Sequence, residues 1–246
     1  MKKNFILKAI LWIVQGFIVG LGAILPGVSG GTMAIILGIY DRLISAVSSF
    51  HKNVKENVLF LALFAIGAGC GFYLFATPVS WFLENFEFPT ICFFVLIVLC
   101  GIPTIGKKSG VQKINFEALM YLIFGALLVT SISRLPSDVF QSMTNVGSRF
   151  WLHLFLSGTA AAVALILPGI SFTHFLLILG LYESLLDAVR NIQLTFLIPL
   201  GLGVVVGVLS LSKLLEHLME KYPKQTYLMI LGFIIGSVSD MLAKYL

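Results

Sequence analysis

The chain carries one motif twice, and this repetition constrains its fold more than any other feature. The first copy reads Leu25-Pro-Gly-Val-Ser-Gly-Gly-Thr32, and the second reads Leu167-Pro-Gly-Ile-Ser-Phe-Thr-His174. Over 25–47 and 167–189 the copies align without a gap at an offset of 142 residues, and 11 of 23 positions are identical. A Pro-Gly break repeated inside apolar sequence is typical of a transporter built from structural repeats.

The composition predicts a membrane protein. Of the 246 residues 59% are apolar and 11% are charged, and the mean hydropathy is +1.02. Soluble domains carry about 25% charged residues, which they need to cover their surface. The apolar stretches approach the roughly 20 residues that a spanning helix requires. We therefore predict an all-α polytopic membrane protein with one integral membrane domain.

Nine hydrophobic segments predict the spanning elements. They run over 5–24, 31–50, 57–80, 90–106, 115–133, 149–167, 172–190, 194–216 and 225–244. The second and seventh are predicted to be continuous helices, and each follows a Pro-Gly break without a polar loop. Such a break is tolerated inside a membrane where it is buried in protein or lines a polar cavity. We predict two re-entrant or broken-helix hairpins, over 5–50 and 149–190, with Pro26, Gly27, Pro168 and Gly169 at breaks near mid-membrane.

The basic residues predict the orientation. With the N-terminus in the cytoplasm, and with a first hairpin that begins and ends there, twelve basic residues fall inside and four outside. Three crossings then separate the hairpins, so the second enters from the opposite face. This gives a first repeat over 1–133, with its hairpin and three spanning helices, and an inverted second repeat over 134–246, with its hairpin and two. The inside set is Lys2, Lys3, Lys8, Arg42, Lys52, Lys55, Lys107, Lys108, Lys113, Lys213, Lys221 and Lys224, and the outside set is Arg134, Arg149, Arg190 and Lys244.

The residues that follow each break are suited to binding an anion. The first N–H groups of a helix lack intrahelical partners and lie at the positive end of its dipole. Glycines let a ligand approach the backbone, and hydroxyls add donors. We predict one central phosphate or carboxylate site between the two tips, with no metal and no cofactor; a simple capped kink is the alternative. The predicted site consists of Ser29, Gly30, Gly31 and Thr32 from the first copy and Ser171, Thr173 and His174 from the second.

Other charged or titratable side chains are candidates for coupling or recruitment. His174 is a phosphate donor, a proton carrier, or a packed neutral residue, since its charge changes near neutral pH. Asp41 and Glu183 follow the motifs by nine residues, which is about 13 Å along a helix. They are candidates for coupling carboxylates, and interfacial helix-end charges are the alternative. Arg134 and Arg149 end apolar segments, where they recruit an anionic headgroup or anchor the chain.

These motifs resemble those of the bacterial polyprenyl-phosphate transporter family. The likeness rests on Leu-Pro-Gly-Val-Ser-Gly-Gly-Thr-x-Ala-x-x-x-Gly-x-Tyr over 25–40 and its partner over 167–183, and it extends over nearly the whole chain. Members usually carry Ser-Gly-Ser in the second motif, where this chain has Ser171-Phe172-Thr173-His174. The resemblance implies a lipid translocase that returns undecaprenyl phosphate from the outer to the inner leaflet of the bacterial cytoplasmic membrane for cell-wall synthesis. It also implies alternating access, with proton coupling as an option.

Two other functions remain open at this point. Undecaprenyl-diphosphate phosphatases have a similar Pro-Gly-x-Ser-Arg-Ser motif, and their chemistry needs that Arg and membrane-embedded acidic residues. Here Gly30 and Phe172 stand at the Arg position, so we predict no enzyme activity. A small-anion carrier or channel would need polar stripes along several helices. The sequence has no P-loop, nucleic acid is not an expected partner, and nothing in it predicts an oligomeric state.

Overall fold

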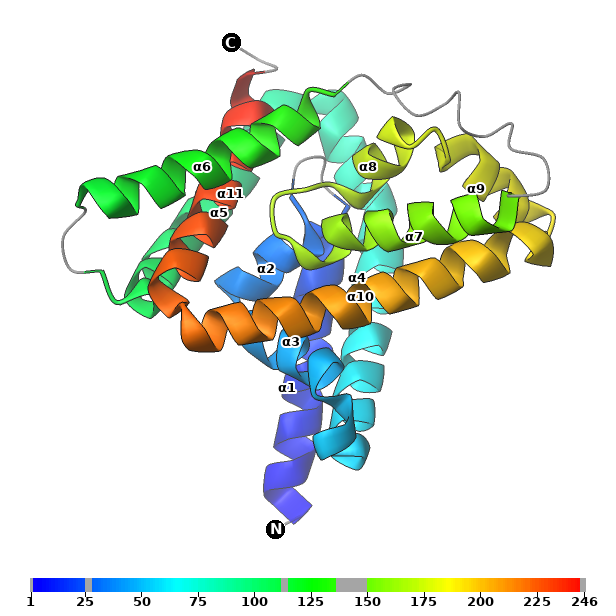
Figure 1. The fold of residues 1–246 in the computed structure, drawn as a ribbon, viewed down its shortest axis with the longest axis horizontal. Helices are drawn as coiled ribbons and strands as arrows, with labels where there is room; N and C mark the ends of the chain where they lie inside the picture. Colours follow the sequence, from blue (N-terminus) through cyan, green and yellow to red (C-terminus); the bar gives the residue numbers. More distant parts are fainter. Residues whose placement is uncertain (1, 25–27, 112–114, 136–149, 244–246) are drawn as a thin grey trace.

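The computed structural model describes residues 2–24, 28–111, 115–135 and 150–243, and these ranges are α-helical (Figure 1). Pro26, Gly27 and Arg149 lie outside the described residues. The first half contains α1 (Lys2–Gly22), α2 (Gly30–Ile36), α3 (Tyr40–Ser48), the 3-10 helix η1 (Phe50–Lys52), α4 (Val54–Asn85), α5 (Glu87–Ser109) and α6 (Phe116–Ser133). The second half contains α7 (Phe150–Ile166), α8 (Phe172–Ile178), α9 (Tyr182–Arg190), α10 (Leu194–Lys221) and α11 (Pro223–Ala243).

Six of the described helices are long and apolar enough to cross a membrane, namely α1, α4, α5, α6, α10 and α11. The number rises to eight if α2–α3 and α8–α9 each count as one span. α7 is apolar but has 17 residues, which is about 25 Å of helix against a hydrocarbon core of about 30 Å. The helices confirm the multi-pass membrane protein that the composition predicts.

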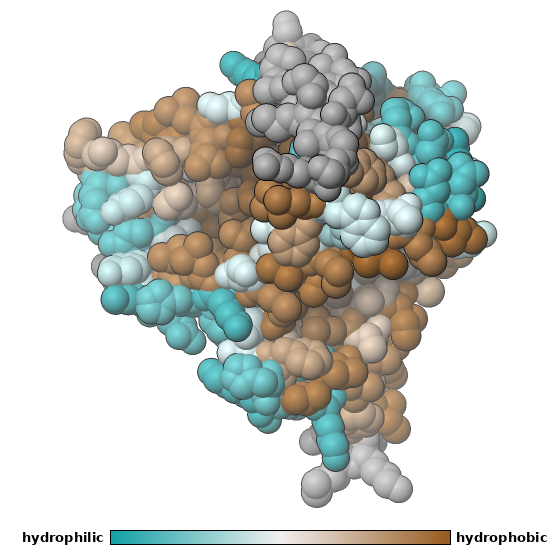
Figure 2. Space-filling view, turned by 45° about the vertical axis from the view of Figure 1, so that its right-hand side comes forward, coloured by the Kyte–Doolittle hydropathy of each residue, from teal (hydrophilic) through white to brown (hydrophobic). Residues whose placement is uncertain are grey.

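Large hydrophobic side chains cover much of the surface. Tyr73 is 82% exposed, Phe116 is 78% exposed and Leu127 is 60% exposed. In Figure 2, hydrophobic residues cover most of the visible face, and the hydrophilic ones gather toward its margins. Soluble monomers rarely expose large contiguous apolar patches. This surface is therefore suited to contact with lipid chains.

The two segments that carry the motif copies each contain two helices, where we predicted one. The axes of α2 and α3 are bent by 118°, and those of α8 and α9 by 108°. Corresponding helices have equal lengths, seven residues in α2 and α8 and nine in α3 and α9. The prediction that Asp41 and Glu183 lie along the same helix as the motif is therefore wrong, because both lie beyond the bend.

A glycine in the left-handed conformation ends the first helix of each bent pair. Gly38 has a φ of +71°, and the N–H of Ile39 donates to the carbonyl of Ala34 at 2.9 Å, which forms a Schellman cap. Gly180 has a φ of +66°, and the equivalent hydrogen bond after it measures 3.0 Å. Residues with a Cβ rarely adopt this φ. The identical glycines therefore place the bend at the same point of both copies.

Glycines also let two helix pairs cross in direct contact. A Cβ on Gly16 of α1 would overlap the carbonyl oxygen of Phe64 in α4, and one on Gly158 of α7 would overlap that of Leu200 in α10. The reciprocal contacts are made by glycines of the partner helices against the backbone of the first helices. They are Gly67 with Ile13 and Gly71 with Phe17 in the first pair, and Gly203 with Phe155 and Gly207 with Thr159 in the second. All of these positions correspond at an offset of 142 residues in α1 and α7 and of 136 in α4 and α10. The two halves thus contain the same helix pair.

α6 packs along α11 through a further close approach. A Cβ on Gly125 would lie 2.5 Å from the carbonyl oxygen of Met229, and one on Gly232 would overlap that of Leu122. Within the described residues, no helix of the second half corresponds to α6. The two halves are therefore similar but unequal in this part of the chain.

Candidate functional site

The two motif copies are joined by a buried hydrogen-bond network. The backbone N–H of Gly169 donates to Oγ of Ser29 at 3.0 Å and to Oγ1 of Thr32 at 3.1 Å. The two hydroxyl oxygens lie 3.1 Å apart, and Ser29 is 8% exposed and Thr32 1%. Gly169 belongs to the second copy and both hydroxyls belong to the first. We call this contact the motif junction.

The second Pro-Gly break lies against the start of α2. Gly169 has a φ of +84°, and a Cβ at this position would lie 2.7 Å from the carbonyl oxygen of Phe233 in α11. Pro168 is fully buried, and its Cα lies 3.4 Å from the place where a Cβ on Gly31 would sit. The first turn of α2 therefore lies directly against the second Pro-Gly break.

The motif serines also cap the helices that follow them. Oγ of Ser29 accepts a hydrogen bond from the N–H of Thr32 at 3.2 Å, and Oγ of Ser171 accepts one from the N–H of His174 at 3.5 Å. Both serines have extended backbone, as N-cap residues do. The helix capping that the sequence allowed as an alternative is therefore present. At Ser29 the capping oxygen also accepts the hydrogen bond of the motif junction.

A second hydrogen bond links the two halves near the junction. The hydroxyl of Tyr40, the first residue of α3, donates to the carbonyl oxygen of Ile166 at the end of α7, at 2.7 Å. Carbonyls in the last turn of a helix lack intrahelical partners, so the tyrosine satisfies one that would otherwise be unpaired. The corresponding Tyr182 makes no such bond among the described residues. This role of Tyr40 was not predicted, although its identity in both copies was visible.

A cavity of about 890 Å³ opens beside the junction. We call it the motif cavity. Its volume falls within the roughly 300–1,000 Å³ of small-molecule sites, and Tyr40 and Ile166 are part of its wall. The two motif copies contribute Val28, Ser29, Gly30, Gly31, Ile170, Ser171, Phe172 and Thr173 to the lining. The structure thus brings together residues that the sequence places 142 positions apart.

Gly30 and Gly31 are not required by packing. A Cβ on Gly30 would have its nearest neighbour, a methyl of Val19, at 3.5 Å, and one on Gly31 would meet Pro168 at 3.4 Å. These are ordinary van der Waals distances, and neither glycine has a positive φ. Their effect is to leave the backbone of the first turn of α2 open toward the cavity, which agrees with a site where a ligand approaches the main chain.

The sequence matches a known family over nearly its whole length. Residues 19–245 fit the model of the VCA0040-like family, which is described as undecaprenyl phosphate translocase-like. The chain belongs to this translocase-like family. It is 30% identical over 239 residues to a polyprenyl-phosphate transporter of Vibrio cholerae, an alignment that covers 92% of this chain and 75% of the relative.

A polyprenyl-phosphate transporter of Staphylococcus aureus is 27% identical over 238 residues, which covers 92% of this chain and 83% of the relative. No solved structure matches the chain. The translocase-like family match confirms the resemblance that the motifs predicted. Both relatives are transporters by name, and this favours a transporter over the phosphatase that the sequence left open.

Two predicted site residues of this translocase-like chain differ in placement. Thr173 is exposed and lines the motif cavity. His174 does not belong to the lining; its Nε2 atom is enclosed and has no hydrogen-bond partner among the described residues. The backbone N–H of His174 serves the Ser171 cap. The structure therefore gathers Ser171 and Thr173 at the cavity and leaves the imidazole apart from it.

The other charged candidates do not form one group. Asp41 pairs with Lys108 at the end of α5, with 2.6 Å between Oδ2 and Nζ, and the same Nζ lies 5.7 Å from the ring centre of Tyr227. This pair fastens α3 to α5, and nothing in the local sequence indicates Lys108 as the partner. Glu183, the counterpart of Asp41, is exposed. Arg134 is largely exposed and lies 3.7 Å from Oδ1 of Asp240.

Proposed function

We propose that the chain carries undecaprenyl phosphate from the outer to the inner leaflet of the bacterial cytoplasmic membrane, for reuse in cell-wall polymer synthesis. Family membership and the transport of polyprenyl phosphate named for the two relatives support the substrate. The main structural support for the proposal is the motif junction. There, an N–H of one copy donates to hydroxyls of the other copy beside one cavity.

In this proposal the phosphate head lies in the motif cavity. Gly30 and Gly31 present the backbone of the first turn of α2, and the hydroxyls of Ser171 and Thr173 approach from the other copy. An isolated charge transferred from water to an apolar medium costs tens of kcal/mol by simple solvation estimates. Polar donors from both copies lower this cost, as they do in transporters with broken helices.

The hydroxyl of Ser29 has a defined part in the proposal. Its oxygen accepts N–H bonds from Thr32 and from Gly169, and these occupy both of its lone pairs. Its hydrogen is therefore the donor in the contact with the Thr32 hydroxyl. Because Ser29 lines the cavity, this hydrogen can turn to a phosphate oxygen, while Thr32 remains a part of the junction.

The prenyl tail remains among lipid chains through a lateral opening. An apolar cavity of about 740 Å³ lies between α1, α4 and α5, and Leu21, Phe75 and Phe94 are among its lining residues. Thr90 is its hydroxyl-bearing member, and this hydroxyl already donates to the carbonyl of Phe86 at 2.7 Å. A wall of this kind suits a polyisoprenoid chain and offers nothing to a headgroup.

Transport in this proposal is alternating access by two inverted repeats. The matched glycine crossings of α1 with α4 and of α7 with α10, and the matched bends at Gly38 and Gly180, support a repeated unit. The two units rock about the motif junction, so that the phosphate stays in one place while its surroundings open first to one face and then to the other.

Purified protein in liposomes that contain labelled undecaprenyl phosphate tests the proposal. We expect exchange of the label between leaflets that protein-free liposomes lack. In parallel tubes with undecaprenyl diphosphate we expect no release of inorganic phosphate. Absence of exchange under conditions where the protein is folded would contradict the proposal, and release of phosphate would assign the protein to the phosphatase class instead.

A further inference from the structure

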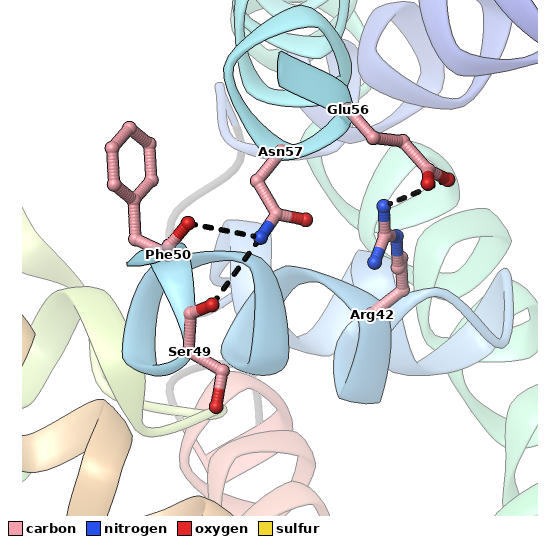
Figure 3. Close-up of polar contacts among 5 residues, drawn as sticks. All are labelled: Arg42, Ser49, Phe50, Glu56 and Asn57. Carbon is pink, nitrogen blue, oxygen red and sulfur yellow. Dashed lines mark hydrogen bonds and ion pairs between the residues drawn. The ribbon is translucent and has the colours of Figure 1, made fainter. Parts of the chain in front are cut away.

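The two halves differ where the second helix of each bent pair meets its neighbours. In the first half, Arg42 of α3 pairs with Glu56 of α4 at 3.2 Å. Nδ2 of Asn57 donates to the carbonyls of Ser49 and Phe50, each at 3.4 Å (Figure 3). These contacts tie α3 and the turn that follows it to the start of α4. We call them the first-half clasp.

Bulky side chains fill the space beside the clasp. The guanidinium carbon of Arg42 lies 5.2 Å from the ring centre of Phe60, and the ring of Trp12 meets Phe60 edge-on at 5.3 Å. Phe60 is completely buried. In the first half, the junction of α1, α3 and α4 is therefore closed by permanent charges and aromatic packing.

The corresponding place in the second half is open. At the offsets that relate the two halves, Ser184 replaces Arg42 and Leu154 replaces Trp12, so that two large side chains are replaced by smaller ones. A pocket of about 340 Å³ is present there. It is lined by Phe150, His153, Leu154, Leu181, Ser184, Asp187, Gln193 and Phe196, and Gln193 and Phe196 are the counterparts of Asn57 and Phe60.

Two titratable side chains line this pocket. His153 comes from α7 and Asp187 from α9, and the first half has Leu11 and Ser45 at the same positions. The start of α10 and the residue before it contribute Phe196 and Gln193, which do not titrate. Nε2 of His153 is shielded from solvent and has no hydrogen-bond partner among the described residues. The pocket thus contains an imidazole nitrogen without a hydrogen-bond partner and, among its lining residues, a carboxylate. An unpaired imidazole nitrogen can take up a proton.

We propose that this pocket binds a proton on His153, and that the resulting imidazolium, opposite the carboxylate of Asp187, holds α9 against α7 as the first-half clasp holds α3 against α4. The second half thereby has a clasp that forms only when the histidine is charged. α9 is joined through the bend at Gly180 to α8, which begins directly after Ser171 of the motif cavity. A proton in the pocket therefore restrains the hairpin that must move during transport.

The consequence for transport rests on the proposed function. Histidine usually changes its charge between about pH 5 and pH 8. The exchange of undecaprenyl phosphate should slow as the pH falls through this range, because the charged clasp restrains α9. A single partly exposed ion pair has a modest energy, so we expect the rate to fall by about threefold to fivefold.

The first half supplies the variants for the test. His153→Leu and Asp187→Ser each introduce the residue that the first half carries at the corresponding position, Leu11 and Ser45. His51→Leu, which removes an exposed histidine of η1, is the matched control. Exchange rates are measured in liposomes with equal pH on both sides, from pH 5 to pH 8. The titration of His153 is followed separately by NMR of histidine-labelled protein, with His153→Leu to assign its signal.

We expect wild type and His51→Leu to slow at low pH, and His153→Leu and Asp187→Ser to lose most of this dependence. An unchanged pH profile in both variants, or a His153 signal that does not titrate, would overturn the proton site. If wild type shows no exchange at any pH, the proposed function fails, and the NMR titration alone decides whether the pocket binds a proton.

Discussion

At the scale of single residues, the site depends on the backbone N–H of Gly169. This one donor lies between the hydroxyls of Ser29 and Thr32, at 3.0 and 3.1 Å, in a part of the chain that is almost fully buried. A buried N–H that loses its acceptors costs about 1–3 kcal/mol. The hydroxyls are therefore needed to keep the start of α2 against the second Pro-Gly break, in addition to any contact with a ligand.

Thr32→Val tests this role of the junction. Valine keeps the shape of threonine and removes one of the two acceptors, so we expect a loss of about 1 kcal/mol in stability and slower exchange of undecaprenyl phosphate. Thr32→Ser retains the hydroxyl and should remain close to wild type in exchange. Thermal unfolding in detergent and exchange in liposomes measure the two effects. Equal behaviour of the valine and serine variants in both assays would show that the hydroxyl has no such role.

Tyr40→Phe tests the second link between the halves. The change removes the donor at 2.7 Å from the carbonyl of Ile166, and we expect a loss of stability of about 1 kcal/mol. Tyr182→Phe is the control, because the Tyr182 hydroxyl has no hydrogen-bond partner among the described residues. The midpoints of thermal unfolding of the two variants should differ, and a pair of equal midpoints would argue against the importance of this bond.

The sequence predicted which residues lie at the motif cavity better than it predicted their contacts. Ser29, Gly30, Gly31, Ser171 and Thr173 line the cavity, and the repeated motif had singled out the segments that contain them. The bond from Gly169 to the first copy was not predicted, because a local pattern does not tell which backbone atoms meet across 137–140 residues. For the same reason His174 was placed with the site, whereas its imidazole lies outside the cavity lining.

At the scale of helices, contact between backbones holds the two matched pairs together. Helices in lipid associate through close packing of small residues, since burial of apolar surface offers little gain there. Gly67 and Gly203 lie where a methyl group would overlap a carbonyl oxygen of the neighbouring helix, whereas Gly69 and Gly201 face open space. On each of these helices, a glycine required by close packing and a glycine that packing does not require thus lie two residues apart.

Alanine substitutions at these four positions test the packing. We expect Gly67→Ala and Gly203→Ala each to cost about 1–3 kcal/mol, because the added methyl group forces the helices apart. Gly69→Ala and Gly201→Ala should be neutral or slightly stabilising. Unfolding in detergent with increasing denaturant measures all four. Similar losses of unfolding free energy at 67 and 203 would agree with equivalent packing of α1 with α4 and of α7 with α10. Tolerance of alanine at both positions would contradict the close contact between these helices.

The bends at Gly38 and Gly180 show where the helical pattern is misleading. Apolar residues continue through both glycines, so a single helix was predicted over each segment. The conformations of +71° and +66° stop the helix regardless of this pattern, because the backbone takes a Schellman turn there. A signal was available: the glycine is identical in both copies and is followed two residues later by an identical tyrosine.

At the scale of the whole molecule, the proposal requires two repeats that cross the membrane in opposite directions. The bias of basic residues and the number of crossings between the hairpins support this orientation. The proposal therefore places the turn after α3 in the cytoplasm and the turn after α9 on the outer face. Lys52 lies in the turn after α3, Arg190 is the last residue of α9, and both residues are exposed.

Labelling of single cysteines tests the inversion. In a background without Cys70, Cys92 and Cys100, we expect Arg190→Cys to react with a membrane-impermeant maleimide added to intact cells, provided that the reagent reaches the outer face. We expect Lys52→Cys to react only after the cytoplasmic membrane is made permeable. Reaction of both cysteines from the same side would exclude inverted repeats.

Leaflet exchange of undecaprenyl phosphate by Gly30→Leu tests whether the phosphate passes between the two motif copies. A Cβ on Gly30 meets only an ordinary contact with Val19, so the longer side chain extends toward the motif cavity, whereas Gly69→Leu adds the same side chain to an exposed helix face. With both variants folded in liposomes, we expect exchange at the wild-type rate by Gly69→Leu and little or none by Gly30→Leu. Exchange at the wild-type rate by Gly30→Leu would show that the phosphate does not pass through the cavity between the two motifs.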